Sequence, residues 1–168
     1  MNIELKPLNY VDPTQLAYFA NDRRVSQYLR NSFPYPYTVA NALSFIQFSI
    51  QNHQLDFGIF VDNICVGCIS ATFQKDIYQN NCEIGYWLGY EYWNKGIMSH
   101  VVCMMVQYLF ENYSIHKIYA EIYAHNIASA HVLEKNGFVK EAHFKEHIFK
   151  NGSYYDAEIY SLLQENKK

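Results

Sequence analysis

The chain has 168 residues, half of them hydrophobic and 17% aromatic, which excludes a disordered chain and suits one domain with a buried core. Its 13 basic and 16 acidic residues give a formal net charge of −3, which offers no electrostatic support for a nucleic-acid partner. The N-terminus has no apolar signal segment and the apolar runs are too short to span a bilayer. We therefore expect a cytoplasmic protein without a membrane partner.

The first part of the chain is predicted to contain one strand and three helices. They are an edge strand at residues 3–8 and helices at residues 13–21, at residues 24–29 and after Thr38. Asp12 followed by Pro13 is a typical helix start, because aspartate caps the helix and proline is accepted in its first turn. Two prolines keep residues 33–37 extended between the second and third helices.

The rest of the chain is predicted to form strands with two intervening helices. The strands are at residues 57–61, 65–73, 82–88, 117–123, 138–149 and 154–163, and the helices at residues 97–109 and 127–135. The strand–helix–strand order over residues 82–123 favours two parallel strands. Turn residues such as Asn151-Gly152 indicate antiparallel hairpins elsewhere. We predict an α/β (mixed α+β) fold in one domain, residues 1–168.

Four cysteines are expected to stay reduced in a chain without a secretion signal. Cys65 and Cys68 have the spacing of a metal or redox pair. No second pair stands at zinc distance, and residues three apart on a regular strand point to opposite faces. The sequence therefore predicts neither a metal site nor a redox site at these cysteines.

The junction Trp93-Asn94-Lys95-Gly96 lies between a predicted strand and a predicted helix. The start of a helix offers unpaired N–H groups and the positive end of the helix dipole. Gly96 lets a ligand approach the backbone, and Lys95 adds positive charge, so the junction suits a phosphate or pyrophosphate. A plain turn before a helix is the alternative. The chain contains neither a P-loop nor a GxGxxG motif, which argues against ATP and dinucleotides as ligands.

Five short segments of the second half occur in a characteristic order and spacing. They are Gly85-Tyr86-Trp87-Leu88, Tyr92-Trp93-Asn94-Lys95-Gly96-Ile97-Met98, Lys117-Ile118-Tyr119-Ala120, Asn126-Ile127-Ala128-Ser129 and Leu133-Glu134-Lys135-Asn136-Gly137-Phe138. Together they resemble the GNAT N-acetyltransferases, which take acetyl from acetyl-CoA. Residues 151–156 and 33–38 resemble the branch that acetylates ribosomal-protein N-termini (RimJ/RimL-like), so the resemblance covers nearly the whole chain.

The resemblance implies a GNAT fold, with a mostly antiparallel sheet splayed between two parallel strands and helices on both faces. It also implies acetyl-CoA as cosubstrate, without a metal. In that family the loop before the long helix wraps the CoA pyrophosphate, and the preceding strand lies along the pantetheine arm and donates amides to the oxyanion. The cofactor-binding residues implied here are Trp87, Leu88, Trp93, Asn94, Lys95, Gly96, Ile97, Met98, Ser99, Asn126 and Ser129.

The reaction needs a base for the amine and, optionally, an acid for the leaving thiolate. Glu83 is the predicted base, because several family members place a carboxylate at the matching position of this strand. A surface or cross-strand glutamate is the alternative. The last hairpin offers rival bases: Glu146, His147 and Asp156. Leu133 stands where many members have a tyrosine acid, so the resemblance offers Ser129 instead. Asn126 has two compatible roles, helix capping and contact with the pantetheine arm.

We predict transfer of acetyl to a primary amine by direct attack in a ternary complex, with a protein N-terminal α-amine as the nearest family example. Polyamines, antibiotics and other small amines are alternative acceptors. A non-catalytic CoA-binding module is the alternative of another class. The predicted acceptor side is formed by Phe33, Tyr35, Tyr37, His147 and Asp156, although core or lid packing is the other fate open to the three aromatic residues. Monomer and homodimer remain open.

Overall fold

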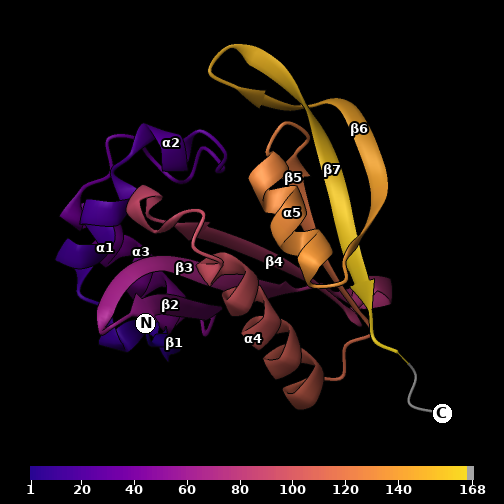
Figure 1. The fold of residues 1–168 in the computed structure, drawn as a ribbon, viewed down its shortest axis with the longest axis horizontal. Helices are drawn as coiled ribbons and strands as arrows, with labels where there is room; N and C mark the ends of the chain where they lie inside the picture. The colour runs from indigo at the N-terminus through magenta and orange to yellow at the C-terminus, as the bar shows by residue number, and fades with distance from the viewer. Residues whose placement is uncertain (166–168) are drawn as a thin grey trace. The chain divides into compact units, whose positions relative to one another are not determined.

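The computed structural model describes residues 1–165, which form seven strands and five α-helices (Figure 1). The strands are β1 (Ile3–Pro7), β2 (Leu55–Val61), β3 (Ile64–Phe73), β4 (Asn81–Leu88), β5 (Lys117–Tyr123), β6 (Val139–Lys150) and β7 (Ser153–Leu163). The α-helices are α1 (Pro13–Ala20), α2 (Arg23–Ser26), α3 (Val39–Gln51), α4 (Ile97–Asn112) and α5 (Ile127–Lys135). Three short 3₁₀ turns are η1 (Leu8–Tyr10), η2 (Asp76–Tyr78) and η3 (Tyr90–Tyr92).

The strands belong to one mixed sheet with the order β1-β2-β3-β4-β5-β7-β6. β4 and β5 are parallel, whereas the pairs β1–β2, β2–β3, β5–β7 and β6–β7 are antiparallel. The predicted mixed α/β class and the predicted parallel pair are therefore confirmed. By its internal contacts the chain divides into two compact units: Met1–Ala71 with Tyr86–Val101, and Thr72–Gly85 with the segment from Val102 onward.

Local signals in the first unit act as the sequence predicts, with one exception. The Asp12 side chain accepts a hydrogen bond from the Thr14 amide and caps α1, and Thr38 caps α3 in a reciprocal capping box with Asn41. The predicted helix over residues 24–29 is wrong in its extent, because α2 ends at Ser26. The Leu29 amide bonds to the Ser26 carbonyl three residues back, so the chain tightens into a turn there.

The core of the first unit is built from η1, α1, α3, β2 and β3. Its buried members are Leu8, Val11, Leu16, Ala17, Ala20, Tyr37, Ala42, Ile46, Phe60, Cys65 and Cys68, with Phe33, Phe45 and Trp87 packed against them. Burial of these apolar side chains removes hydrocarbon surface from water and is the main stabilising term for the unit.

A β-bulge in β3 changes the expected placement of two cysteines. Ile59 pairs with Gly67 but Phe60 pairs with Cys65, so β3 carries one extra residue there. The bulge breaks the alternation, and Cys65 and Cys68 lie in the same core cluster. The prediction that they point to opposite faces is therefore wrong. Burial raises the pKa of the Cys65 thiol to about 11, and all four cysteines are free thiols.

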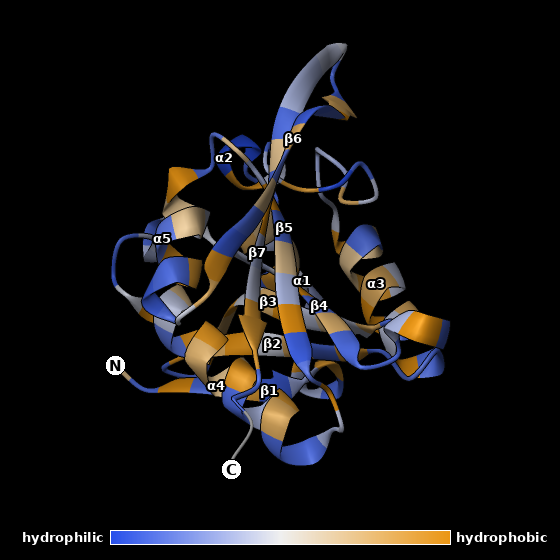
Figure 2. Cartoon of the chain, turned by 90° about the vertical axis from the view of Figure 1, so that its right-hand side faces the viewer, coloured by the Kyte–Doolittle hydropathy of each residue, from blue (hydrophilic) through white to orange (hydrophobic). Residues whose placement is uncertain are grey.

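The second unit contains the parallel pair and the long C-terminal hairpin. β4 pairs with β5 from Asn81–Lys117 to Glu83–Tyr119, and β5 pairs with β7 along its whole length. Hydrophobic and hydrophilic residues are interleaved along β6 and β7 (Figure 2). The register of the β6–β7 ladder shifts by one residue between Lys140 and Ala142, and a larger bulge interrupts it between Phe144 and Ile148. None of the helices within residues 1–165 is long and apolar enough to cross a bilayer.

Candidate functional site

The turn between β4 and α4 presents unpaired backbone amides. Asn94 and Gly96 both have left-handed conformations, with φ angles of 58° and 74°, and α4 begins at Ile97. Within residues 1–165, the N–H groups of residues 94–98 have no hydrogen-bond acceptor. The first N–H groups of a helix lack partners inside the helix, and left-handed residues gather neighbouring amides around one concavity. The turn is therefore an array of donors that suits an anion.

Gly96 leaves this donor array open. A Cβ built at Gly96 would meet no atom within 4 Å, so open space borders the backbone at this point. Glycine also adopts a φ of 74° at no steric cost. Lys95 adds positive charge, and its ammonium group lies 5.3 Å from the centre of the Tyr92 ring. The predicted anion site thus has the donors, the opening and the charge that a phosphate group requires.

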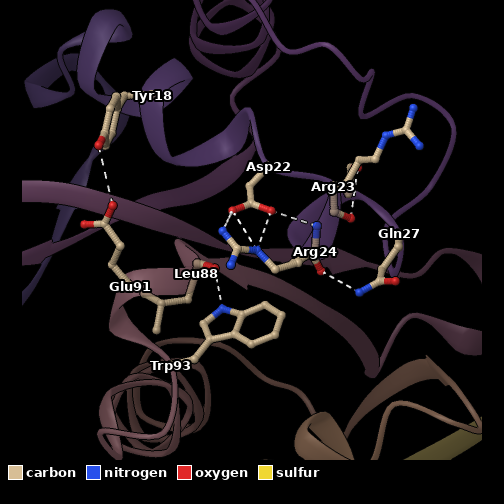
Figure 3. A network of polar contacts seen from close by, with 9 residues as sticks. Tyr18, Asp22, Arg23, Arg24, Gln27, Leu88, Glu91 and Trp93 are labelled. Atoms are coloured by element: carbon tan, nitrogen blue, oxygen red, sulfur yellow. Dashed lines mark hydrogen bonds and ion pairs between the residues drawn. The ribbon is translucent and has the colours of Figure 1, made fainter.

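Contacts that begin at α2 support the turn, and Figure 3 shows the Arg24–Asp22 and the Trp93–Leu88 contacts among them. The indole N–H of Trp93 donates to the Leu88 carbonyl at 2.7 Å, which ties the turn to the last residue of β4. The Trp93 ring packs 5.2 Å from the Tyr90 ring, and the Arg24 guanidinium lies 3.4 Å from the Tyr90 ring centre. Arg24 Nε donates to Asp22 at 2.9 Å, and these hydrogen bonds lower the pKa of Asp22. This support could not be predicted from the sequence, because Arg24 and Tyr90 lie far apart in the chain.

We expect Trp93→Phe to lower the free energy of unfolding by about 1 kcal/mol, because the partly buried Leu88 carbonyl loses its donor. Urea unfolding followed by circular dichroism measures the change. Tyr18→Phe is the matched control, since the Tyr18 hydroxyl is exposed and lies 3.5 Å from Glu91. Its effect should stay within about 0.5 kcal/mol. Equal losses in the two variants would contradict a specific role for the indole N–H.

The predicted acceptor-side aromatic residues of the first unit differ in exposure. Tyr37 is buried, and burial raises the pKa of its hydroxyl to about 12. The Phe33 ring lies 4.7 Å from the Tyr37 ring and 5.5 Å from the Trp87 ring, so Phe33 links the core to the end of β4. Tyr35 is exposed, and the Arg23 guanidinium lies 5.1 Å from its ring centre. Core packing thus accounts for Phe33 and Tyr37, and Tyr35 is the accessible member of the group.

Glu83 lies at the last residue pair of the parallel β4–β5 ladder, opposite Tyr119. Its neighbours Cys82 and Ile84 are buried, so the Glu83 side chain projects from the other face of β4, where it is partly buried. Beyond this pair β4 continues to Leu88.

Asn126 and Ser129 form the capped start of α5. The Asn126 side-chain oxygen accepts from the Ser129 amide at 3.3 Å, which confirms the predicted capping role. The cap uses the oxygen of the Asn126 amide group and leaves its NH₂ for a second contact. Ser129 is almost fully buried beside the cap. Leu133 is completely buried one turn further on, so it belongs to the packing of the helix.

Asp156 and His147 lie in and beside the bulge of the β6–β7 hairpin. Asp156 Oδ1 accepts from the Glu146 amide at 2.7 Å, and Asp156 Oδ2 lies 2.8 Å from His143 Nε2. His147 is exposed, with its ring 5.0 Å from the Phe144 ring. Both Asp156 oxygens are therefore already engaged within the hairpin. His143 was absent from the predicted site residues, because only the bulge places it opposite Glu158.

The predicted site residues fall into two sets. Those of the first unit are Phe33, Tyr35, Tyr37, Trp87, Leu88, Trp93, Asn94, Lys95, Gly96, Ile97, Met98 and Ser99, and those of the second are Glu83, Asn126, Ser129, His147 and Asp156. No group of three or more His, Cys, Asp or Glu side chains within residues 1–165 could hold a metal ion.

Comparison with known proteins gives a consistent result. Residues 2–139 match the family described as Acetyltransferase (GNAT) domain. The SPbeta prophage-derived uncharacterized N-acetyltransferase YokL of Bacillus subtilis (strain 168) is 28% identical over 163 residues, 94% of this chain and 89% of that protein. The [ribosomal protein uS5]-alanine N-acetyltransferase of Escherichia coli (strain K12) is 30% identical over 81 residues, 48% of this chain and 42% of that protein. The solved structure of RimL, a ribosomal L7/L12 alpha-N-protein acetyltransferase in complex with coenzyme A, superposes with a TM-score of 0.83 at 22% identity and covers 97% of this chain and 94% of that one.

Proposed function

The chain belongs to the GNAT acetyltransferase family, and we propose that this acyltransferase transfers the acetyl group of acetyl-CoA to a primary amine by direct attack in a ternary complex. The proposed first acceptor is a protein N-terminal α-amine of the ribosomal-protein type. Relatives and structural neighbours that carry such activities in their names support this choice. Small amines such as polyamines or antibiotics are the second acceptor class, because substrates change readily within one fold.

The observation that carries the proposal is the donor turn at residues 93–99. Unpaired amides at residues 94–98, the left-handed Gly96 with open space beside it and the charge of Lys95 fit a pyrophosphate group. The turn has neither the P-loop motif of ATP sites nor the GxGxxG motif of dinucleotide sites, so we assign the pyrophosphate of CoA to it. The residues of this turn would hold the nucleotide end of the cosubstrate.

When bound, acetyl-CoA supplies a thioester carbonyl that a neutral amine can attack. We propose that the backbone amides of Trp87 and Leu88 donate to the oxygen as it becomes negative. Glu83 accepts the proton of the amine, since it lies on the same strand where the parallel ladder ends. Ser129 donates a proton toward the leaving thiolate, because Leu133 has no group that could do so.

The acceptor can be identified with an amine panel read by mass spectrometry. The panel should contain peptides with different N-terminal residues, polyamines and aminoglycosides, each incubated with acetyl-CoA and the intact protein. A mass increase of one acetyl group, mapped to a peptide α-amine, supports the ribosomal-protein type of acceptor. Acetylation of small amines alone would move the protein to the second acceptor class.

A CoA-binding module without catalysis is the alternative of another class, and the buried Leu133 in place of an acid favours it. Thioester loss measured with and without amines separates the two. An enzyme consumes acetyl-CoA faster when its acceptor is present, whereas a sensor or scaffold binds the thioester and leaves it intact.

Acetyl-CoA at 100 times its Kd should raise the melting temperature by roughly 5–10 °C, because a ligand that binds only the folded chain stabilises it by mass action. ATP and NAD at the same concentration should produce little change, since the chain lacks their binding motifs. Differential scanning fluorimetry measures all three. Equal stabilisation by ATP would contradict the assignment of the turn to CoA.

A further inference from the structure

The imidazole of His143 lies between two carboxylates of the neighbouring strand. Nε2 is 2.8 Å from Asp156 Oδ2, and Nδ1 is 3.1 Å from Glu158 Oε1. Carboxylates only accept hydrogen bonds, so both ring nitrogens must donate for both contacts to be favourable, and only the imidazolium form has two N–H groups. The hydrogen bonds to Glu158 and, next, to Asp156 also raise the pKa of His143. The geometry thus selects a protonated His143.

Other charged groups on the hairpin do not remove this preference. Lys140 Nζ lies 3.2 Å from the oxygen of Glu158 that faces His143, and the Tyr160 hydroxyl donates to the other Glu158 oxygen at 3.4 Å. Burial of Glu158 opposes its ionisation, but the bonds from His143 and Lys140 outweigh it and its pKa is lowered. Lys145 on β6 adds a weak attraction for Asp156. The cluster is therefore anionic on β7 and cationic on β6.

Asp156 connects this cluster to two backbone segments. Its Oδ1 accepts from the amide of Glu146, which has a φ of 52°, a left-handed conformation that residues other than glycine rarely adopt. Its backbone carbonyl accepts from the Ala124 amide at 2.9 Å, two residues before the Asn126 cap. One residue thus fixes the bulge of β6 and the start of the turn that leads into α5.

We propose that His143 is a positioning residue. As an imidazolium it holds the Asp156 side chain in the orientation that fixes the β6 bulge. This bulge contains Glu146 and His147, and Asp156 thereby holds it in place relative to the turn before Asn126. This inference rests on the proposed function only where it concerns acetyl transfer. The interaction is fully present below the ordinary pKa of histidine and is lost as the pH rises through the elevated pKa of His143. The rate of acetyl transfer to the acceptor should therefore lose this contribution as the pH rises above the pKa of His143.

The first test is an NMR titration of the wild-type protein, which needs no substrate. The Glu146 amide proton donates to a carboxylate at 2.7 Å, so we expect it downfield and expect its shift to move with the same midpoint as the His143 ring signals. In Asp156→Asn that midpoint should fall toward the ordinary value. A Glu146 amide that does not respond while His143 titrates would overturn the proposal.

The second test compares variants in acetyl transfer. Near pH 6, His143→Gln should reduce kcat/KM for the acceptor by about tenfold, with the KM for acetyl-CoA unchanged, because a small displacement of reacting groups is costly. The ratio of wild-type to variant kcat/KM should approach one at alkaline pH, and this ratio cancels the titration of the acceptor amine. His143→Arg keeps a permanent positive fork, so it should restore the rate and remove the pH dependence.

His53→Asn is the matched control, because His53 is exposed in the first unit and its φ of 50° is one that asparagine tolerates. It should show the wild-type profile. If His143→Gln and His143→Arg both showed the wild-type dependence of kcat/KM on pH, the proposal would be overturned. If the protein neither binds acetyl-CoA nor acetylates an amine, the proposed function fails, and the NMR titration still decides whether His143 fixes the bulge.

Discussion

Gly96→Asp should weaken acetyl-CoA binding on the order of 1,000-fold, because the new carboxylate would stand beside the amides that we assign to the pyrophosphate. Two like charges 4 Å apart repel by about 4 kcal/mol at an effective dielectric constant of 20, and each 1.4 kcal/mol, roughly, is tenfold in affinity. A Cβ at Gly96 would meet no atom within 4 Å, so the first atom of the new side chain makes no clash. Isothermal titration calorimetry measures the loss directly.

Backbone strain must be separated from charge in this experiment, since Gly96 has a φ of 74°. Gly96→Asn is the matched control. Asparagine has the size of aspartate, tolerates the left-handed conformation about as well and carries no charge. We expect Gly96→Asn to bind acetyl-CoA at least about 100-fold more tightly than Gly96→Asp, because it lacks the charge repulsion. Equal losses in the two folded variants would mean that conformation alone matters, and unchanged affinity in both would exclude this turn as the pyrophosphate site.

The donor turn could be predicted from the sequence because its determinants are local. A strand, a Lys95-Gly96 pair and a helix lie within a few residues of one another, and helix geometry alone leaves the first amides unpaired. The support of the turn is not local. Arg24 reaches Tyr90 from a segment more than sixty residues earlier in the chain, and no periodicity in either segment announces that contact.

The bulge on β3 and the bulge between Phe144 and Ile148 explain most of what could not be predicted from the sequence. On β6 and β7, Lys150 pairs with Ser153 and Ile148 with Tyr155, so an unbroken ladder would place Lys145 opposite Glu158. The bulge shifts the register by two residues and places His143 there instead. A bulge is stabilised by contacts that form only after the strands pair, here the Asp156 bond to the Glu146 amide. Hydrophobic alternation alone therefore missed the cluster.

The bulge on β3 likewise changed the placement of two side chains, Cys65 and Cys68. An extra residue between Cys65 and Gly67 brought Cys65 and Cys68 into one core cluster. The conclusion that this pair has no redox role nevertheless stays reasonable, because burial raises the pKa values of both thiols and the reactive form of a cysteine is the thiolate. The absence of a redox role stays a prediction, now supported by burial of the thiols and no longer by strand alternation.

Glu83→Gln should lower kcat/KM for the acceptor amine by roughly 100-fold or more at neutral pH, the range expected when a general base is removed. The amide keeps the shape of the side chain but cannot accept the proton, so the KM for acetyl-CoA should change less than about twofold. Ser129→Ala should have a smaller effect, since a thiolate leaves tolerably without an acid. Steady-state kinetics with the acceptor found in the amine panel measures both.

The pH dependence distinguishes a base from a residue that only shapes the site. As the pH rises, a larger fraction of the amine is already neutral and needs no base, so the deficit of Glu83→Gln should shrink steadily. Glu121→Gln is the matched control, because Glu121 is an exposed glutamate on the neighbouring strand β5 of the same unit. It should behave as wild type. A deficit in Glu83→Gln that stays constant with pH would indicate a structural role, and a wild-type rate throughout would transfer the role to Glu146 or His147, which lie in the bulge that Asp156 fixes.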